Sequence, residues 1–258
     1  SDICKTEMKF SVYEPPVIKS KKLPVLFYLA GLTCTEETFM IKAGALNKAS
    51  ELGLILVSPD TSPRNSLNGE ESKDWDFGSG AGFYLDATQQ PWNDNYKMFS
   101  YVTKELPKII HDNFNSNPDK QSIFGHSMGG HGALICALKR PDLYKSISAF
   151  APISSPINSP WGAKAFAGYL GDNQTKWQDW DSSYLIEKCN NSFDQILIDQ
   201  GTSDEFLEKE LKPNIFFEKC KVVNQKLIMR YQENYDHGYN FISTFINDHL
   251  NFHFDRLK

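Results

Sequence analysis

The sequence predicts an α/β fold built on a largely parallel sheet with helices on both faces. Short runs rich in β-branched and aromatic residues alternate with segments in which apolar residues recur at helical spacing. The 258 residues suffice for a sizeable core, and no linker, repeat or low-complexity tract divides them, so we expect one domain over residues 1–258. A third observation is local: Ser127 stands between a strand-like run and a helix-like run.

Each predicted element follows from its own pattern. Residues 8–13 alternate apolar and polar side chains and end before a pair of prolines, which is typical of an edge strand. Residues 23–29 and 54–58 are apolar runs of the length of buried strands, and helical spacing predicts one helix over 36–52 between them. An amphipathic helix is predicted over 96–114, with a kink at Pro107. The remaining predicted strands are 121–125, 146–151, 195–199 and 226–232, and the remaining helices run from the turn at Ser127 to Lys139 and over 241–252.

Ser127 is the predicted catalytic nucleophile. It is the centre of a G-x-S-x-G sequence, Gly125-His126-Ser127-Met128-Gly129, at the junction of strand and helix. The serine of such a turn adopts a strained backbone that exposes its hydroxyl, and the small residues around it let strand and helix approach closely. Since the first amides of a helix lack intrahelical partners, the Met128 amide is one predicted donor to an oxyanion.

His237 is the predicted general base, because a serine hydroxyl needs a base that accepts its proton. This histidine lies in a loop after a predicted strand and before a helix, and it completes the chain order serine, acid, histidine. The other histidines are interpreted as helix or surface residues: His126 and His131, which flank the serine at poor angles, and His111, His249 and His253 in predicted helices.

The acid is expected between the serine and the histidine, in a loop after a strand. Asp204 is favoured, since it lies past the turn at Gly201 with the reach to orient an imidazole. Asp199 is the alternative, but it belongs to the strand end and is expected to pair with backbone or a neighbouring loop. Asp236 is disfavoured because it is adjacent to His237 in sequence.

The second oxyanion donor is predicted to be the Leu32 amide, in the loop after the strand at residues 23–29. Gly31 supports this assignment because a glycine lets the backbone come close to a substrate oxygen. An alternative reading of the next residues, 35–38, is that they only cap a helix.

Composition and charge exclude several classes of function. The net charge of −5 and the lack of a basic stripe argue against nucleic acid, and the apolar runs are too short to span a bilayer. The first residues lack a secretory pattern, and the five cysteines are scattered, so we expect free thiols and a cytoplasmic location. The glycines of 78–82 predict a tight loop and not a nucleotide site, and His, Asp and Glu show no metal-ligand spacing. We therefore expect neither a cofactor nor a metal.

Several stretches resemble the S-formylglutathione hydrolase (esterase D) family. The resemblance runs from about residue 8 to the C-terminus and is carried by residues 31–36 (GLTCTE), 59–64 (PDTSPR), 75–84 (WDFGSGAGFY), 124–132 (FGHSMGGHG), 160–166 (PWGAKAF), 199–201 (DQG) and 235–237 (YDH). It implies an α/β-hydrolase fold and hydrolysis of S-formylglutathione to glutathione and formate through a formyl-serine intermediate. It also implies a homodimer, and it places the family's catalytic triad on Ser127, Asp204 and His237. The chain starts later than the family usually does, so an N-terminal hairpin is expected to be missing, and residues 64–74 diverge; both points bear on acyl selectivity.

Formyl is the smallest acyl group, so we expect a pocket that is narrow on the acyl side and polar on the glutathione side. Trp161, Phe77 and Phe83 are the candidate aromatic walls, with a place in the core as the alternative for each. Cys34 is interpreted either as a small buried filler or as a thiol that lines the pocket. A broad-specificity carboxylesterase on the same fold is the alternative function.

Overall fold

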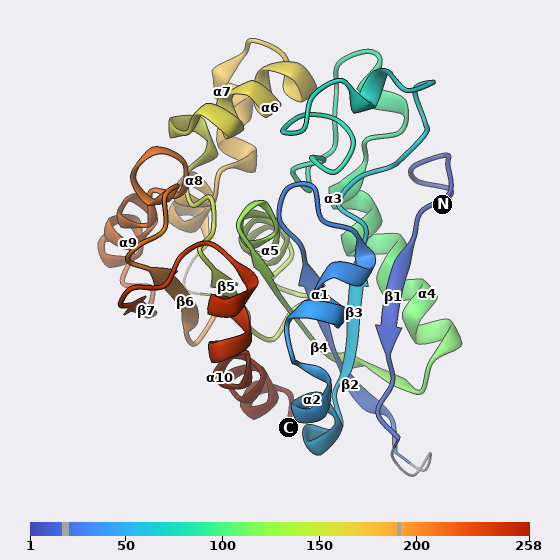
Figure 1. Ribbon diagram of the computed structural model, residues 1–258, viewed down its shortest axis with the longest axis vertical. Coiled ribbons are helices and arrows are strands. Elements are labelled where there is room, and N and C mark those ends of the chain that lie inside the picture. The colour runs from blue at the N-terminus through green and yellow to red at the C-terminus, as the bar shows by residue number, and fades with distance from the viewer. Residues whose placement is uncertain (17–20, 190–191) are drawn as a thin grey trace.

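The computed structural model describes residues 1–16, 21–189 and 192–258. Within these ranges seven strands form one sheet in the order β1-β3-β2-β4-β5-β6-β7 (Figure 1). Strand β1 pairs antiparallel with β3, and every other neighbouring pair is parallel. The strands are β1 (Phe10–Tyr13), β2 (Leu23–Leu29), β3 (Ile55–Pro59), β4 (Ser116–His126), β5 (Ile147–Phe150), β6 (Ile196–Gly201) and β7 (Leu227–Gln232).

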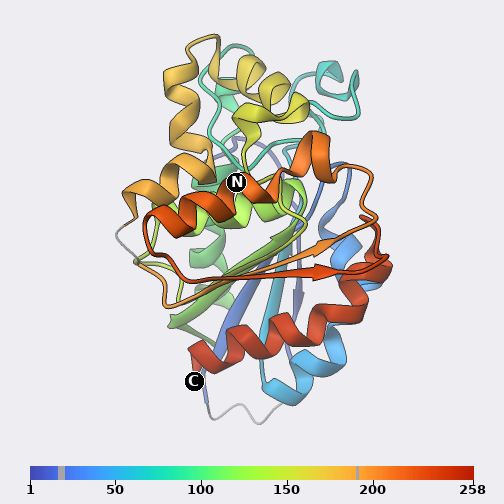
Figure 2. The ribbon, with the colours of Figure 1, turned by 90° about the vertical axis from the view of Figure 1, so that its left-hand side faces the viewer.

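Helices cover both faces of this sheet, as the alternation of patterns predicts. Helices α2 and α10 pack together on one face, and α5 packs on β4 and β5 from the other face (Figure 2). The helices are α1 (Glu36–Lys42), α2 (Leu46–Leu52), α3 (Met98–Ser100), α4 (Leu106–Asn113), α5 (Met128–Lys139), α6 (Pro160–Leu170), α7 (Gln174–Trp177), α8 (Ser182–Leu185), α9 (Pro213–Val222) and α10 (Tyr239–Leu257). Within the described ranges, no helix has the length and apolar character needed to cross a membrane.

The central strands are buried because both faces of the sheet are covered. Six of the seven residues of β2 are buried, as are all five of β3, which explains why their sequences read as continuous apolar runs instead of alternating ones. Between β5 and β6 the chain makes a long excursion through α6, α7 and α8, which lies beyond the carboxyl ends of the strands (Figures 1 and 2). This excursion forms one side of the region where the predicted catalytic loops meet.

Two helix predictions need correction. Residues 36–52 form two helices instead of one, because the chain turns at Gly44, whose φ of +67° is accessible to glycine at little cost. The segment predicted over 96–114 is helical from Met98 to Asn113, and its middle widens into a π-helical stretch, Tyr101–Glu105, directly before Leu106 and Pro107. A proline inside a helix removes one backbone donor and crowds the preceding turn, so the widened stretch is the local response to Pro107.

Candidate active site

Ser127 occupies a sharp turn between β4 and α5, with φ +57° and ψ −120°. Glycine is required on both sides of it. A Cβ on Gly129 would lie 1.9 Å from the carbonyl oxygen of Leu29, and one on Gly125 would lie 2.2 Å from the carbonyl oxygen of Gly129. The G-x-S-x-G pattern is therefore a steric requirement of this strand–helix contact.

The strained conformation of Ser127 is held by backbone hydrogen bonds to the next strand and its loop. The Ser127 amide donates to the carbonyl of Phe150 at 3.0 Å, and the Ser127 carbonyl accepts from the amide of Ile153 at 3.2 Å. Such a backbone persists only where its surroundings over-determine it, and it is typical of a functional position. The Met128 amide is the first of α5, so it has no partner within the helix.

His237 and Asp204 form a close pair at the carboxyl end of the sheet. The His237 Nδ1 lies 2.6 Å from the Asp204 Oδ2, and His237 is partly exposed while the Asp204 side chain is fully buried. The other carboxylate oxygen of Asp204 accepts from the Phe206 amide at 2.9 Å, and Gln200 Nε2 lies 3.2 Å from Oδ2. Because Nδ1 of His237 is hydrogen-bonded to the Asp204 carboxylate, Nε2 is the ring nitrogen that can accept a proton on the cavity side.

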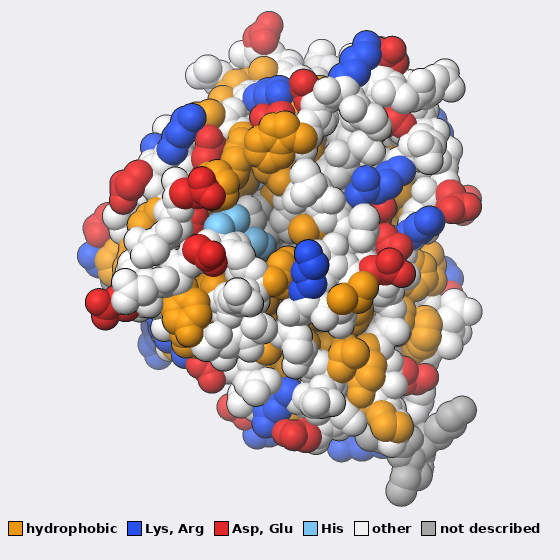
Figure 3. All heavy atoms as spheres, viewed as in Figure 1, with side chains coloured by type: hydrophobic (Ala, Val, Ile, Leu, Met, Phe, Trp, Pro, Cys, Tyr) orange, Lys and Arg blue, Asp and Glu red, His pale blue; other side chains and the backbone are white. Residues whose placement is uncertain are grey.

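Ser127 and His237 line the same cavity, of about 240 Å³, although they are 110 residues apart in sequence. Its walls expose mainly apolar surface, and Figure 3 shows a histidine side chain in a hollow beside hydrophobic side chains. The lining residues are Gly31, Leu32, Cys34, Trp75, His126, Ser127, Trp161, Phe206, His237 and Tyr239. Loops after β2, β4, β6 and β7 thus meet here, at the carboxyl ends of parallel strands.

The loop after β2 lies directly against the serine. A Cβ on Gly31 would stand 3.2 Å from the Cβ of Ser127, so this glycine allows the backbone of residues 31 and 32 to approach the hydroxyl. The capping alternative for the next residues is also realised, because Thr35 and Thr38 form a capping box at the start of α1. The predicted oxyanion donor is Leu32, whereas the cap is formed by Thr35 and Thr38. The two interpretations are therefore compatible, since they concern different residues of one loop.

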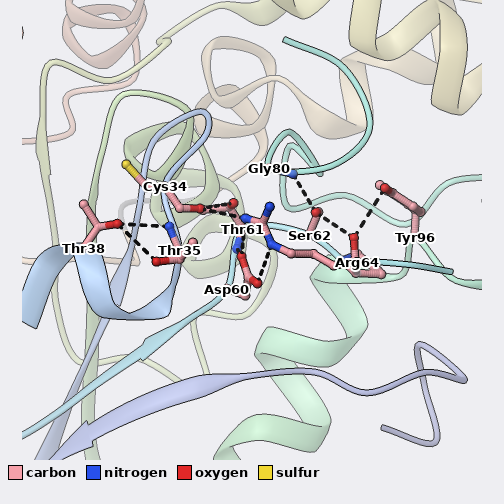
Figure 4. A network of polar contacts seen from close by, with 10 residues as sticks. Cys34, Thr35, Thr38, Asp60, Thr61, Ser62, Arg64, Gly80 and Tyr96 are labelled. Carbon is pink, nitrogen blue, oxygen red and sulfur yellow. Dashed lines mark hydrogen bonds and ion pairs between the residues drawn. The ribbon is translucent and has the colours of Figure 1, made fainter. Parts of the chain in front are cut away.

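Polar contacts hold the same loop from behind (Figure 4). The carbonyl of Cys34 accepts from Thr61 Oγ1 at 2.6 Å and from Arg64 Nη2 at 3.1 Å. Arg64 is itself fixed by both carboxylate oxygens of Asp60, at 2.7 and 2.8 Å. Cys34 is half-buried and lines the cavity, and burial raises the pKa of its thiol, so the thiol is neutral at pH 7.

The aromatic candidates separate into two groups. Trp161 lies on the cavity wall, where its ring contacts Trp75 at 5.7 Å and Phe206 at 4.8 Å between ring centroids. Phe77, the other predicted substrate contact, is not among the residues that line this cavity, and its ring stacks on Tyr169 at 4.6 Å between ring centroids. Because a Cβ on Gly168 would lie 2.3 Å from the Phe77 ring, that ring fills the space above a glycine of α6. Phe83 is fully buried and belongs to the core, whereas Phe77 is partly buried and packs against the core.

The interpretation of His126 also needs correction, because the sequence favours a residue of helix packing or of the surface. Its ring is buried and lies 4.4 Å from that of His237, between ring centroids. Burial, and then the neighbouring His237, lower the pKa of His126 well below its usual value, so its imidazole is neutral. No sequence signal reported this contact, because the two histidines meet only through folding.

Trp75, Phe206 and Tyr239 are further wall residues that the sequence reasoning did not assign. Phe206 follows Asp204 by two residues and lies 5.1 Å from the His237 ring, so its place in the acid loop was the available signal. Tyr239 follows His237 by two residues, at the start of α10. Trp75 belongs to residues 75–84, one of the stretches that resemble the S-formylglutathione hydrolase family, but no role was predicted for it.

Asp199, the alternative acid, belongs to a different cluster. Its carboxylate is fully buried and paired with Arg230 at 2.5 and 2.6 Å, and His249 Nε2 lies 3.5 Å away. His249 Nδ1 in turn lies 2.7 Å from Ser148 Oγ. We call Ser148, His249 and Asp199 the core triad, and Ser127, His237 and Asp204 the pocket triad. The expectation that Asp199 pairs with backbone or a loop was wrong, because Arg230 reaches it from the adjacent strand β7.

His253 extends this buried network and shows that the two histidines of α10 are not ordinary helix residues. Its ring nitrogens lie 2.7 Å from the hydroxyls of Ser146 and Ser148. Within the described ranges, no group of three or more His, Cys, Asp or Glu side chains is placed to hold a metal ion.

Comparison with known proteins agrees with this geometry. Residues 1–252 match the protein family described as "Esterase". An S-formylglutathione hydrolase of Bos taurus is 54% identical over 251 residues, 96% of this chain and 89% of the relative, and one of Arabidopsis thaliana is 54% identical over 97% of this chain and 89% of the relative. The chain belongs to the S-formylglutathione hydrolase family of esterases.

The solved structure of an S-formylglutathione hydrolase from Agrobacterium tumefaciens superimposes on this esterase with a TM-score of 0.96. The two are 49% identical, and the match covers 100% of this chain and 93% of the other. The α/β-hydrolase fold is thus shown by a close relative as well as by the strand order described above.

Proposed function

We propose that this esterase hydrolyses the thioester S-formylglutathione to glutathione and formate. The observation that carries the proposal is the convergence of Ser127 and the His237–Asp204 pair on one small, mostly apolar cavity. Family membership at 54% identity supports the same substrate. In the formaldehyde detoxification that depends on glutathione, this reaction is the step that releases formate.

In the first half of the proposed reaction, Ser127 Oγ attacks the formyl carbon while His237 Nε2 accepts the hydroxyl proton. Asp204 holds the tautomer of His237 and stabilises the imidazolium without taking the proton. The amides of Leu32 and Met128 donate to the oxyanion of the tetrahedral intermediate. Collapse of this intermediate breaks the carbon–sulfur bond, and His237 returns the proton to the departing sulfur, which leaves glutathione and a formyl-serine.

In the second half, His237 removes a proton from water, and the resulting hydroxide attacks the formyl carbon of the acyl-serine. The second tetrahedral intermediate uses the same two amides. Its collapse breaks the carbon–oxygen bond to Ser127, whose oxygen recovers a proton from His237, and formate leaves. A thiolate is a much better leaving group than an alkoxide, so the first half is the easier one for a thioester.

Trp161 is the proposed acyl-side wall, and Cys34 the proposed wall on the side of α1. The indole of Trp161 is fixed by Phe206 and Trp75, and its backbone amide donates to the buried carboxylate of Glu210 at 3.0 Å. A wall supported on several sides limits the acyl group to a small one. Phe77 is dropped from the proposed substrate contacts, because it packs elsewhere.

The decisive experiment is turnover of S-formylglutathione against a simple acetyl ester by the same preparation. We expect kcat/KM to be far higher for S-formylglutathione. A preference for the acetyl ester favours the alternative, a broad-specificity carboxylesterase. Ester hydrolysis alone does not discriminate, since an acyl-serine mechanism serves both substrates.

We also propose a reducing compartment, the cytoplasm, and a homodimer. All five cysteines are free thiols, and four of them are buried, which suits a compartment without disulfide formation. Helix α9 carries an exposed apolar side chain, Val222, beside a shallow surface pocket that Ile215 also lines. Sedimentation of the purified chain, with and without Val222→Asp, tests the dimer.

A further inference from the structure

We propose that Lys42 binds a carboxylate of the glutathione portion of the substrate and thereby selects anionic thiol leaving groups over neutral ones. The inference rests on the proposed function and adds a residue that recognises the leaving group. It starts from a mismatch: the cavity walls are mostly apolar, whereas a glutathione thioester carries two carboxylates and one ammonium group.

Lys42 is placed at the edge of this cavity. It is the last residue of α1, the helix that begins directly after the loop of Leu32 and Cys34. Its Nζ lies 5.9 Å from the centroid of the Tyr239 ring, and Tyr239 and Cys34 both line the cavity. The charge is felt at the cavity wall: burial raises the pKa of the Cys34 thiol, and Lys42 is among the groups that lower it.

Lys42 also differs from the other cations near the cavity in having a free charge. Arg64 is committed to Asp60, and Lys164, near the Trp75 side, is committed to Asp74 and Asp76. Among the residues that the structure describes, no carboxylate lies within 4.0 Å of the Lys42 ammonium group.

The chemistry of the substrate fits this position. When the thioester carbonyl is at Ser127, the sulfur lies at the cavity, and the glycine carboxylate of glutathione is less than two extended residues away, roughly 7 Å. A carboxylate at the mouth then meets a cation on the side of α1. The whole chain carries a net charge of −5, so a local cation is needed to attract an anionic substrate.

The test compares wild type, Lys42→Arg, Lys42→Met and Lys42→Glu on two substrates with the same formyl thioester. One substrate is S-formylglutathione, and the other is S-formyl-N-acetylcysteamine, whose thiol portion has no charge. On S-formylglutathione we expect kcat/KM to fall about 5-fold for Met and about 30-fold for Glu, the range for a partly exposed ion pair that is removed or reversed. The fall in kcat/KM should come from a rise in KM, with kcat unchanged. Lys42→Arg should keep most of the activity.

On the uncharged thioester, all four proteins should have the same kcat/KM. Lys108→Glu, on the exposed surface of α4, is the matched control for the change in net charge and should behave as wild type. An equal fall on both substrates, or no fall with Lys42→Glu, overturns the inference. If wild type itself fails to hydrolyse S-formylglutathione, the proposed function fails first, so the two failures are distinguishable.

Discussion

The pocket triad and the core triad contain the same three residue types in two very different settings. In the pocket triad, Ser127 has a strained backbone at a helix start and shares a cavity with His237. In the core triad, Ser148 belongs to the regular strand β5, and His249, a residue of α10, is completely buried. Both carboxylates are buried, but Asp199 is neutralised by Arg230, whereas Asp204 faces its histidine and backbone and amide donors.

If Ser127 is the nucleophile as proposed, the comparison indicates that residue types and proximity alone do not make a serine reactive. The core triad has no room for a substrate, and its serine lacks a free helix amide that can receive negative charge. Its hydroxyl also lies near two imidazoles, those of His249 and His253, so it serves as a hydrogen-bond bridge between α10 and the sheet. Access, backbone strain and nearby free amides thus separate a site of chemistry from a structural network.

Replacing the two serines should give the largest contrast. Ser127→Ala is expected to lower kcat on S-formylglutathione by about 10⁵-fold or more, because the covalent step is lost. Ser148→Ala should keep kcat within a few-fold, with its effect confined to stability. Steady-state kinetics on both variants, with circular dichroism to verify folding, makes the comparison. Full activity in Ser127→Ala contradicts the assignment of the pocket triad.

The two aspartates should separate in the same way. Asp204→Asn is expected to lower kcat by about 10⁴-fold, because the amide supports the wrong tautomer of His237. Asp199→Asn should instead lower the free energy of unfolding by about 3 kcal/mol, because Arg230 and His249 lose a buried partner. Kinetics of the folded protein and urea unfolding report the two effects. If Asp199→Asn is stable and inactive, the acid has been misassigned.

Acid pH should destabilise the fold through the core histidines. Burial lowers the pKa of His249 and His253, so they stay neutral in the native state while the unfolded chain takes up protons near pH 6.5. Stability is therefore complete above about pH 7.5 and falls as the pH drops through 6.5, by about 1.4 kcal/mol per pH unit for each such histidine. His126 and His131, which are also buried, add to the effect.

One carboxyl acts in the opposite direction, because burial raises the pKa of Asp181 to about 6. In the native state this group binds a proton more readily than in the unfolded chain, so it offsets one histidine below about pH 6. Urea unfolding at pH 8, 7 and 6 measures how the free energy of unfolding depends on pH above about pH 6. His253→Gln should make this pH dependence shallower by about half a proton between pH 7 and 6, and an unchanged slope in this variant refutes the role of His253.

Cys34 offers the smallest expected effect, and it concerns only the pocket. Alkylation of its thiol is expected to lower kcat/KM about 10-fold or more by blocking the cavity, but slowly, because burial keeps the thiol protonated. Cys34→Ser should abolish this sensitivity while it keeps activity. The other four cysteines are buried and serve as internal controls. Continued inhibition of the serine variant rules Cys34 out.

Local patterns in the sequence predicted most of the fold. Buried strands such as Leu23–Leu29 have uninterrupted apolar sequences, and each of the seven predicted strands has a counterpart in the sheet. Gly44 was not recognised as the end of a helix, because apolar residues keep helical spacing across it. Its positive φ ends the helix there, and apolar spacing alone does not report a residue's φ.

Within the candidate site, residues whose role follows from their order along the chain could be predicted. Contacts between segments that are far apart in sequence could not. Asp204 was separated from Asp199 by its position past a glycine turn, and the structure places it against His237. The contact of His126 with His237 joins segments 111 residues apart, and no periodicity encodes it. Phe77 and Trp161 are both partly buried aromatic residues, and only the packing of Phe77 on Gly168 and Tyr169 distinguishes it from the cavity wall.

The hydrogen bonds that Thr61 and Arg64 donate to the Cys34 carbonyl have a consequence for how such an enzyme can diversify. They fasten the loop of the proposed oxyanion donor Leu32 to residues that directly follow β3, and not to the segment that continues beyond Arg64. Substitutions in residues 65–74, which directly precede the wall residue Trp75, can therefore leave the hydrogen bonds that hold this loop unchanged. The segment beside the cavity wall and the contacts that hold the loop of the proposed oxyanion donor are thus separate stretches of the chain.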